Sequence, residues 1–327
     1  MPKALITTVP FGEKSKKALD LLSQNNIDYL INPLNKKLTE NELAEIVRDF
    51  DVIVAGTEPI TKKVMNNASN LKMISRVGIG LDSVDLLEAE KRGITVCYTP
   101  DAPAPAVSEL TIGLMLTLLR SVHISNIEMH NGKWHRFFGR RLSEITVGII
   151  GVGRIGNGVL KHLQGFAPTK ILLNDTKQNH NLDEKNNIKW VDKETIYKQA
   201  DIVTLHVPLT VQTKNMVKKA QLLSMKEDAI IINTARGGII NELDLYDVMR
   251  EGHLSGAAID VFDLEPYDGK LKEIQRCILT AHMGSMSVDC RTRMEIEATE
   301  EAVHFLKNEP LERVVPEEEY TVQREKL

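Results

Sequence analysis

The sequence has few cysteines and no long apolar run. Its three cysteines, Cys97, Cys277 and Cys290, are far apart and form no CxxC pair. This spacing suggests neither a disulfide framework nor a zinc site, so we expect reduced thiols and no bound metal. No stretch approaches the ~20 apolar residues of a membrane-spanning helix, and the apolar run near the N-terminus is too short for a signal peptide. We therefore expect a cytoplasmic protein with no membrane partner.

The chain also lacks a large excess of charge of either sign. Charged residues make up 26% of it and leave a net charge of −4, which gives no sign of a surface for nucleic acid. Hydrophobic residues make up 42%, enough for sizeable cores. Because 327 residues exceed one ordinary domain, two domains of about 100 to 200 residues each are expected.

Short apolar runs alternate with helical patterns along the chain. Five runs in the first hundred residues are typical of strands: 4–9, 27–31, 52–55, 73–77 and 94–98. Seven more follow: 147–150, 171–173, 188–191, 202–207, 229–234, 256–262 and 278–281. Helices are expected at 38–50, 106–119, 193–198, 218–224, 242–251 and 292–307. Such alternation predicts an α/β fold with doubly wound parallel sheets covered by helices on both faces.

The stretch from Thr146 to Asp175 predicts a nucleotide site. An apolar run opens into Gly151, Gly153 and Gly156, an amphipathic segment follows, and a second apolar run ends at Asp175. Glycines at these positions allow a tight turn, close approach of a pyrophosphate, and close packing of helix on strand. The helix N-terminus then offers free N–H groups to the phosphates, and Asp175 can accept hydrogen bonds from a ribose diol.

The predicted domains are not consecutive in the chain. The segment 101–105, DAPAP, is interpreted as a hinge, since two prolines in three residues interrupt regular structure. The last helix is expected to return to the first sheet, because the second sheet is complete without it. We predict a flavodoxin-like substrate domain, residues 1–101 with 286–327, and an inserted Rossmann domain, residues 102–285. From Pro316 the charged end is expected to be loosely held.

Three chemically suitable residues follow separate strands of the second sheet. Arg236, Glu265 and His282 all come just after apolar runs, at the edge where open parallel sheets bind ligands. Histidine suits the transfer of a hydroxyl proton, a carboxylate stabilises its protonated form, and an arginine fork binds a carboxylate. Taken singly, each also has a packing or turn interpretation. His206, at the end of its own strand, could touch a cofactor, but a structural role is favoured.

Several ordered motifs between Met73 and Met294 resemble the D-isomer-specific 2-hydroxyacid dehydrogenase family, with phosphoglycerate dehydrogenases the most similar members. They are RVGIGLDSVDL, SELTIGLMLTLLR, GKW, TVGIIGVGRIG, DIVTLHVPLT, INTARGGIINE, GAAIDVFDLEP and AHMGS. The resemblance implies NAD as cofactor, His282 as general acid/base, Glu265 as its partner, and Arg236 as the anchor for the substrate's carboxylate and reacting oxygen. It also implies a homodimer, with the helix after the hinge and the segment around Trp134 at the interface.

The same resemblance extends the set of site residues. The substrate carboxylate is expected at the backbone of Val77, Gly78, Ile79 and Gly80. The expected cofactor-binding residues are Gly151, Gly153, Arg154, Ile155, Gly156, Asp175, Pro208, Thr213, Thr234, Ala235, Asp260 and Gly284. Asp175 favours NAD over NADP because a 2′-phosphate would meet its carboxylate, although Lys177 could soften that repulsion.

Departures from the family pattern leave the substrate open. Phosphoglycerate dehydrogenases often carry an arginine after the third strand of the first domain that contacts the substrate phosphate. The corresponding run here is Ala55, Gly56, Thr57, Glu58 and Pro59, and the acid at Glu58 would repel a phosphate. Glu58 could instead favour an unphosphorylated or amine-bearing side chain, or simply form an ion pair with Arg76. No regulatory C-terminal domain is expected, and Glu265 stands where formate-oxidising relatives carry glutamine. The leading hypothesis is a D-2-hydroxyacid dehydrogenase of the 3-phosphoglycerate or hydroxypyruvate/glyoxylate type. The alternative is a non-catalytic, NAD(H)-sensing protein similar to a corepressor.

Overall fold

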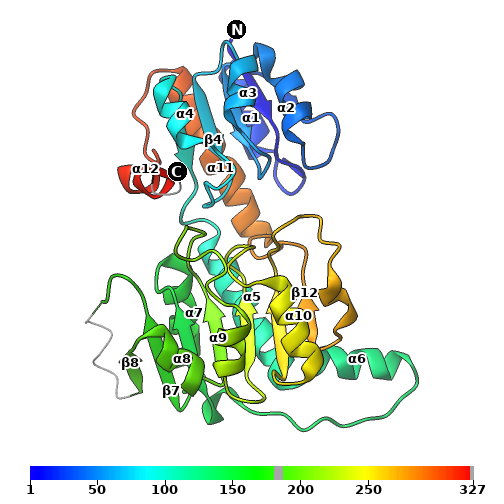
Figure 1. Cartoon of the computed structure of the whole chain (residues 1–327). Helices are drawn as coiled ribbons and strands as arrows, with labels where there is room; N and C mark the ends of the chain where they lie inside the picture. The colour runs from blue at the N-terminus through cyan, green and yellow to red at the C-terminus, as the bar shows by residue number, and fades with distance from the viewer. Residues whose placement is uncertain (180–186, 325–327) are drawn as a thin grey trace. The chain divides into compact units, whose positions relative to one another are not determined.

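The computed structural model of the chain describes residues 1–179 and 187–324 (Figure 1). It divides into two compact units, Met1–Pro103 with Met286–Leu327, and Ala104–Ser285. The long helix α5 (Ala104–Leu119) starts two residues earlier than the sequence predicts, so Pro105 lies inside its first turn. That position suits proline, because the first N–H groups of a helix have no intrahelical partner.

The first unit is built on a parallel five-stranded sheet with the strand order β2-β1-β3-β4-β5. Its strands are β1 (Lys3–Ile6), β2 (Asp28–Ile31), β3 (Val52–Ala55), β4 (Met73–Arg76) and β5 (Thr95–Tyr98). Its main helices are α1 (Lys17–Gln24), α2 (Glu40–Ile46), α3 (Lys62–Asn67), α4 (Leu86–Lys91) and α11 (Val288–Leu306). This strand order is the flavodoxin-like one, so the predicted architecture is confirmed.

Alternating side chains of the central strands are buried on the two faces of this sheet. On β3, Val52 and Val54 join the core formed with α1 and α11, whereas Ile53 and Ala55 join the core beneath α2, α3 and α4. The two-residue period of a strand produces this division. Because both faces are apolar, the strand reads as a continuous hydrophobic run, which is why the sequence predicts it within a residue or two.

The end of the chain is more ordered than the sequence predicts. Val315 N donates to Val96 O at 2.9 Å, so this segment lines the β5 edge of the sheet. Helix α12 (Glu317–Arg324) then lies against α4, and Gln323 bonds to Val84 O and Leu86 N. The expectation of a loosely held end is therefore wrong for residues 317–324, because buried hydrogen-bond partners fix a helix whose own sequence is charged. Residues 325–327 lie outside the described part.

The second unit contains a parallel seven-stranded sheet with the order β12-β11-β10-β9-β6-β7-β8. Its strands are β6 (Thr146–Ile150), β7 (Lys170–Asn174), β8 (Ile188–Trp190), β9 (Ile202–Leu205), β10 (Ile230–Asn233), β11 (Gly256–Ile259) and β12 (Cys277–Leu279). The chain runs outward from β6 in one direction and then from β9 in the other. This reversal is the topological switch point of a Rossmann sheet, where dinucleotides bind.

Helices cover both faces of the second sheet. On one face lie α5 and α7 (Arg154–Gln164), and on the other lie α8 (Lys193–Gln199), α9 (Lys219–Ser224) and α10 (Glu242–Glu251). Helix α5 packs tightly on α7, since a Cβ atom at Gly158 would lie 2.3 Å from Ser108 Oγ. No described helix is by itself long and apolar enough to cross a membrane; α5 with α6 (Val122–His130), bent by 63°, passes as a pair by length and composition alone.

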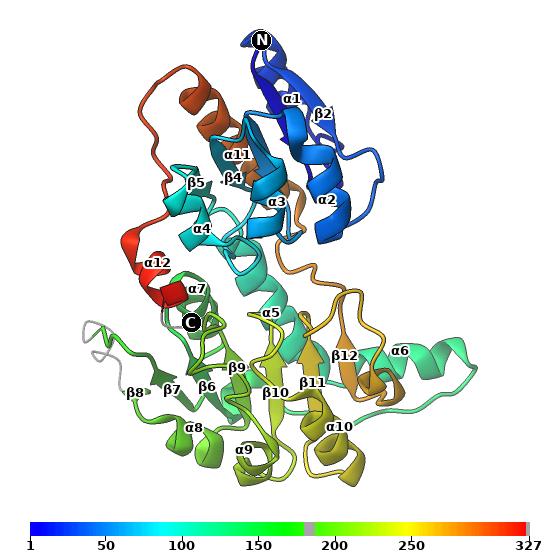
Figure 2. The same cartoon turned by 45° about the horizontal axis from the view of Figure 1, so that its top comes forward.

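An arm formed by residues 120–139 projects from the second unit (Figures 1 and 2). It contains α6, which buries none of its residues, and an irregular segment that follows. The two ends of the arm lie side by side, because Arg140 N donates to Leu119 O at 3.2 Å. Along it Trp134 and Phe138 are 80% and 104% exposed. Aromatic side chains are enriched at protein–protein interfaces, so the arm is a candidate contact surface.

Candidate active site

The glycine motif forms a nucleotide turn at the switch point between β6 and β9. Gly151 has φ +92°, and a Cβ atom there would lie 2.5 Å from His206 O. A Cβ atom at Gly156 would lie 1.9 Å from Gly151 O, so the first turn of α7 passes directly over the loop. At Gly153, in contrast, a Cβ atom would meet no protein atom within 4 Å. These features fit a pyrophosphate bound at the N-terminus of α7.

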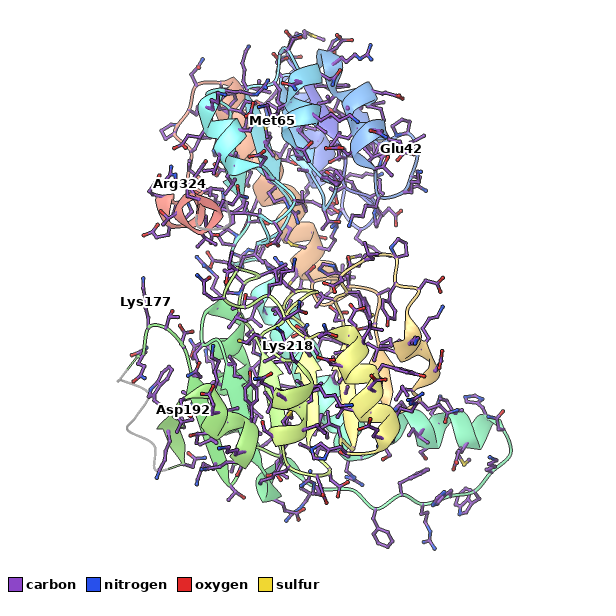
Figure 3. The ribbon with its side chains drawn as sticks, in the orientation of Figure 1. Glu42, Met65, Lys177, Asp192, Lys218 and Arg324 are labelled. Carbon is purple, nitrogen blue, oxygen red and sulfur yellow. The ribbon has the colours of Figure 1, made fainter. Side chains whose placement is uncertain are left out.

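Asp175 lies at the end of β7 and is tied to the nucleotide turn. Its Oδ2 accepts a hydrogen bond from Val152 N at 2.6 Å, and its Oδ1 accepts one from Lys177 N at 3.1 Å. The Lys177 side chain stands beyond β7 in Figure 3. Oδ1 also accepts a hydrogen bond from Thr176 Oγ1 at 3.2 Å. A carboxylate has about four acceptor positions, so Asp175 keeps capacity for a ribose hydroxyl. The residues present therefore fit the adenosine half of a dinucleotide.

His282 and Glu265 form a direct pair in the loops after β12 and β11. His282 Nδ1 lies 3.0 Å from both carboxylate oxygens of Glu265. This geometry assigns the Nδ1 proton to the hydrogen bond with the carboxylate and directs Nε2 to exchange a proton with a ligand. The imidazole side chain is 38% exposed, so a ligand can reach it. The pair can act as a general acid and base.

Asp260 follows β11 and lies beneath the loop that carries His282. Its carboxylate accepts hydrogen bonds from Thr280 Oγ1 at 2.6 Å, from Met283 N at 2.9 Å and from Gly284 N at 2.9 Å. Burial raises the pKa of Asp260, and these hydrogen bonds oppose that effect. The sequence placed Asp260 and Gly284 at the cofactor, but it did not reveal that they bond to each other.

Arg236 follows β10, the neighbour of β11 in the sheet. Its Nη1 donates to Ala235 O at 2.6 Å. Thr234, two residues before Arg236, shares a 2.9 Å hydrogen bond with Thr111 on α5. Since β10, β11 and β12 are adjacent and parallel, Arg236, Glu265 and His282 follow the same edge of the sheet as the nucleotide turn.

The loop after β9 holds the remaining cofactor candidates. Thr213 Oγ1 donates to Pro208 O at 2.6 Å, which closes this loop beside the switch point. His206 Nε2 shares a 2.9 Å hydrogen bond with Thr204, and burial lowers the pKa of His206 to about 3. An imidazole that stays neutral throughout the physiological pH range does not serve as a general acid. Its geometry accords with the structural role favoured from the sequence.

The expected substrate backbone follows β4 in the first unit. Gly78 has φ +135°, a conformation that side chains rarely adopt, and its N–H donates to Thr99 Oγ1 at 2.7 Å. That N–H is therefore already used within the protein. The turn is nevertheless a backbone loop at the carboxyl end of a parallel strand, where ligands of open α/β sheets bind.

Glu58 lies after β3 at the same edge of the first sheet and is 2% exposed. Its carboxylate accepts hydrogen bonds from Gly56 N at 2.7 Å and from the Thr7 hydroxyl. These contacts join the loops after β1 and β3, and they orient Glu58 toward Gly56 and Thr7. Sequence reasoning did not identify Thr7, because only the fold brings the first and third strands side by side.

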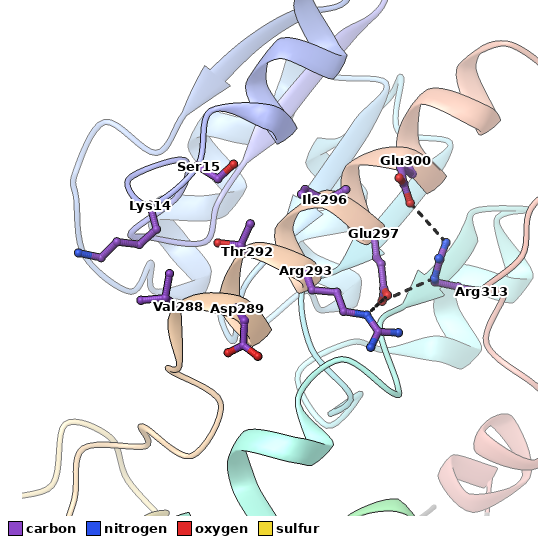
Figure 4. Close-up of a pocket in the computed structure, with 10 residues that line it drawn as sticks. All are labelled: Lys14, Ser15, Val288, Asp289, Thr292, Arg293, Ile296, Glu297, Glu300 and Arg313. Carbon is purple, nitrogen blue, oxygen red and sulfur yellow. Dashed lines mark hydrogen bonds and ion pairs between the residues drawn. The ribbon is translucent and has the colours of Figure 1, made fainter. Parts of the chain in front are cut away.

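A groove on the first unit lies beside α11 (Figure 4). Its lining includes Arg293, Glu297, Glu300 and Arg313. Arg293 pairs with Glu297 at 2.6 Å, and Arg313 lies 3.6 Å from Glu297 and 3.8 Å from Glu300. These four charges partner one another, so they are not available as a ready-made ligand site.

Among residues 1–179 and 187–324, no three histidine, cysteine, aspartate or glutamate side chains could together hold a metal ion.

Comparison with known proteins identifies the family. The sequence model described as "D-isomer specific 2-hydroxyacid dehydrogenase, NAD binding domain" matches residues 112–284. The chain is also 35% identical over 273 residues to the hydroxypyruvate reductase of Thermotoga maritima, covering 81% of this chain and 88% of that protein. The chain belongs to the D-isomer specific 2-hydroxyacid dehydrogenase family. The resemblance found in the sequence is thus confirmed, with NAD as the cofactor and oxidoreduction as the activity.

Further relatives agree with this assignment. The D-3-phosphoglycerate dehydrogenase of Methanocaldococcus jannaschii is 38% identical over 321 residues, which cover 96% of this chain but only 59% of that longer protein. Among solved structures, the TT0316 protein from Thermus thermophilus has a TM-score of 0.88 at 30% identity, covering 96% of this chain and 100% of its own. An NAD-dependent formate dehydrogenase from Staphylococcus aureus, in complex with NAD, has a TM-score of 0.84 at 26% identity, covering 96% and 99%.

Proposed function

We propose that the protein interconverts a D-2-hydroxy acid and its 2-keto acid, with His282 as the general acid and base. The observation that carries this proposal is the symmetric pairing of His282 Nδ1 with both Glu265 oxygens at 3.0 Å. The pair stands on the same sheet edge as a glycine turn that fits a pyrophosphate. When bound, NAD supplies or accepts the hydride at the carbon that carries the oxygen.

Each residue of the trio has a distinct role in this proposal. During reduction, protonated His282 donates its Nε2 proton to the substrate oxygen, and during oxidation neutral Nε2 removes it. Glu265 holds the ring in place and stabilises its charged form. Arg236 binds the substrate carboxylate through its planar fork.

We assign cofactor binding to residues 102–285 and substrate binding to the rest of the chain. The family match at residues 112–284 supports the first assignment. The second rests on the loops after β1, β3 and β4, which end at the carboxyl edge of the first sheet. In this assignment the backbone from Val77 to Gly80 receives the substrate carboxylate.

We further propose that the substrate is unphosphorylated, of the hydroxypyruvate or glyoxylate type. Glu58 is a buried acid at the substrate edge of the first unit, and a phosphate dianion beside it would meet a like charge at low dielectric. The hydroxypyruvate reductase of Thermotoga maritima, of which the match covers 88%, supports this choice. The match to the D-3-phosphoglycerate dehydrogenase covers only 59% of that protein, so it supports a phosphorylated substrate less.

A steady-state comparison of kcat/KM tests the proposal with glyoxylate, pyruvate, hydroxypyruvate and 3-phosphohydroxypyruvate, each with NADH. The unphosphorylated acids are expected to be preferred over 3-phosphohydroxypyruvate. The Glu58→Gln variant can still accept the hydrogen bonds from Gly56 and Thr7, but it lacks the negative charge. It should therefore lower the ratio of kcat/KM for the unphosphorylated acids to kcat/KM for 3-phosphohydroxypyruvate by roughly tenfold. A wild-type preference for the phosphorylated acid would contradict the assignment of Glu58. Normal NADH binding without turnover of any keto acid would favour the sensor hypothesis instead.

We also propose that the protein is a cytoplasmic homodimer. The exposed Trp134 and Phe138 on the arm support an interface with a second copy. The three cysteines are buried free thiols, which suits a reducing compartment.

A further inference from the structure

His282 has a backbone conformation that is uncommon for its residue type. Its φ is +49°, in the left-handed region that residues other than glycine seldom adopt. The pairing with Glu265 fixes only the ring, through Nδ1. Some other group must therefore hold the backbone of the residue that exchanges the proton.

The buried Asp260 supplies these contacts. His282 N donates to Asp260 O at 2.8 Å, and the next two N–H groups, those of Met283 and Gly284, donate to the two carboxylate oxygens at 2.9 Å. Thr280, two residues before the histidine, donates its hydroxyl to the same carboxylate at 2.6 Å. Asp260 thus bonds to residues on both sides of His282.

We call this set of contacts the Asp260 cradle. Burial and a main-chain hydrogen bond hold its carboxylate in place. Asp260 is 1% exposed, and its main chain is fixed to β10 because Asp260 N donates to Asn233 O at 3.0 Å. A Cβ atom at Gly284 would lie 3.0 Å from Asp260 Oδ2, so the loop packs closely against the carboxylate. An anionic acceptor buried against two N–H groups and a hydroxyl forms strong, short hydrogen bonds.

We infer that Asp260 is a positioning residue for catalysis, which holds the His282 turn and so aims Nε2 at the reacting oxygen. The inference rests on the proposed role of His282 as the general acid and base. It gives the Asp260 carboxylate a role distinct from the cofactor contact that the family resemblance implies. Because the carboxylate acts through the loop, its loss should lower the rate of the chemical step more than the affinity for either ligand.

The Asp260→Asn variant tests this inference in the full-length protein. An amide keeps the size of the carboxylate but removes its charge and replaces one acceptor with a donor, so it cannot satisfy the Met283 and Gly284 N–H groups together. We expect kcat for keto-acid reduction to fall about 10- to 100-fold, with KM for the keto acid and the NADH dissociation constant within about twofold. The exposed Asp263→Asn in the same loop is the matched control and should keep wild-type kcat.

Hydrogen–deuterium exchange provides a readout that is independent of turnover. The amides of the segment 280–285 should exchange faster in Asp260→Asn than in Asp263→Asn. Thr280→Val, which removes only the hydroxyl contact, should show a smaller effect of the same sign, and it serves if Asp260→Asn does not fold. Unchanged exchange in both variants, or an NADH dissociation constant that rises in proportion to the loss in kcat, would overturn the inference. If the wild type turned over no keto acid, the proposed function would fail, while exchange would still decide whether Asp260 holds the turn.

Discussion

The carboxylate of Asp175 gives the site its expected preference for NAD. It lies at the end of β7, bonded to Val152 N at 2.6 Å, where a 2′-phosphate would meet a like charge. Asp175→Asn, which keeps an acceptor for Val152, should raise the kcat/KM ratio of NADPH to NADH about tenfold or more. Lys177→Ala should lower the same ratio. Equal use of both cofactors by the wild type would show that Asp175 does not discriminate.

The pair formed by Glu265 and His282 predicts a loss of rate when the carboxylate is replaced. Reduction of a keto acid needs a proton from Nε2, and Glu265 orients the ring through Nδ1. In Glu265→Gln, kcat/KM at neutral pH should therefore fall roughly 10- to 100-fold. Stopped-flow oxidation of NADH measures this loss. An unchanged kcat/KM would mean that Glu265 only packs against the ring.

The sequence predicts residues that act through their own chemistry better than residues that act through contacts. Arg236, Glu265 and His282 are predicted from the sequence because each follows a strand of one predicted sheet. The Asp260 cradle was not found, since it joins residues 20 to 24 positions apart through backbone N–H groups that carry no sequence signal. Gly56 and Thr7, the hydrogen-bond partners of Glu58, were not predicted for the same reason.

At the scale of elements, the turn between β6 and α7 predicts different effects for two neighbouring glycines. Gly156→Ala places a Cβ atom 1.9 Å from Gly151 O, so both thermal stability and NADH binding should fall. Gly153→Ala meets no protein atom within 4 Å, so its stability should change by less than about 0.5 kcal/mol. NADH affinity should nevertheless drop about tenfold, because the new methyl group faces the expected pyrophosphate.

Calorimetry and NADH fluorescence titration on both glycine variants separate the two effects. Wild-type NADH affinity in Gly153→Ala would place the pyrophosphate elsewhere.

Elements differ in how far local sequence determines them. The strands of both sheets were expected, because strands buried on both faces appear as uninterrupted apolar runs. Helix α12 was not, since its first turn contains Glu317, Glu318 and Glu319 and its contacts come from α4, far earlier in the chain. Helix α6 was missed because it buries nothing and so has no apolar stripe to detect.

At the scale of the whole molecule, the arm of residues 120–139 predicts the oligomeric state. If the arm binds a second copy, replacing both Trp134 and Phe138 with aspartate should convert a dimer into a monomer, as measured by sedimentation velocity. Leu243→Asp on α10, which is 62% exposed in the wild type, is the matched control and should remain dimeric. A wild-type protein that sediments as a monomer would contradict the proposal.

The inserted arrangement of the two units has a consequence for synthesis. Every strand of the first sheet leaves the ribosome before residue 104, but α11, which covers one face of that sheet, begins only at Val288. Residues 104–285 are complete by then and can fold as a unit. Until α11 has been synthesised, one apolar face of the sheet formed by β1–β5 stays uncovered. A released fragment that ends just before Val288 should therefore resist protease in the inserted unit and be cleaved in the first.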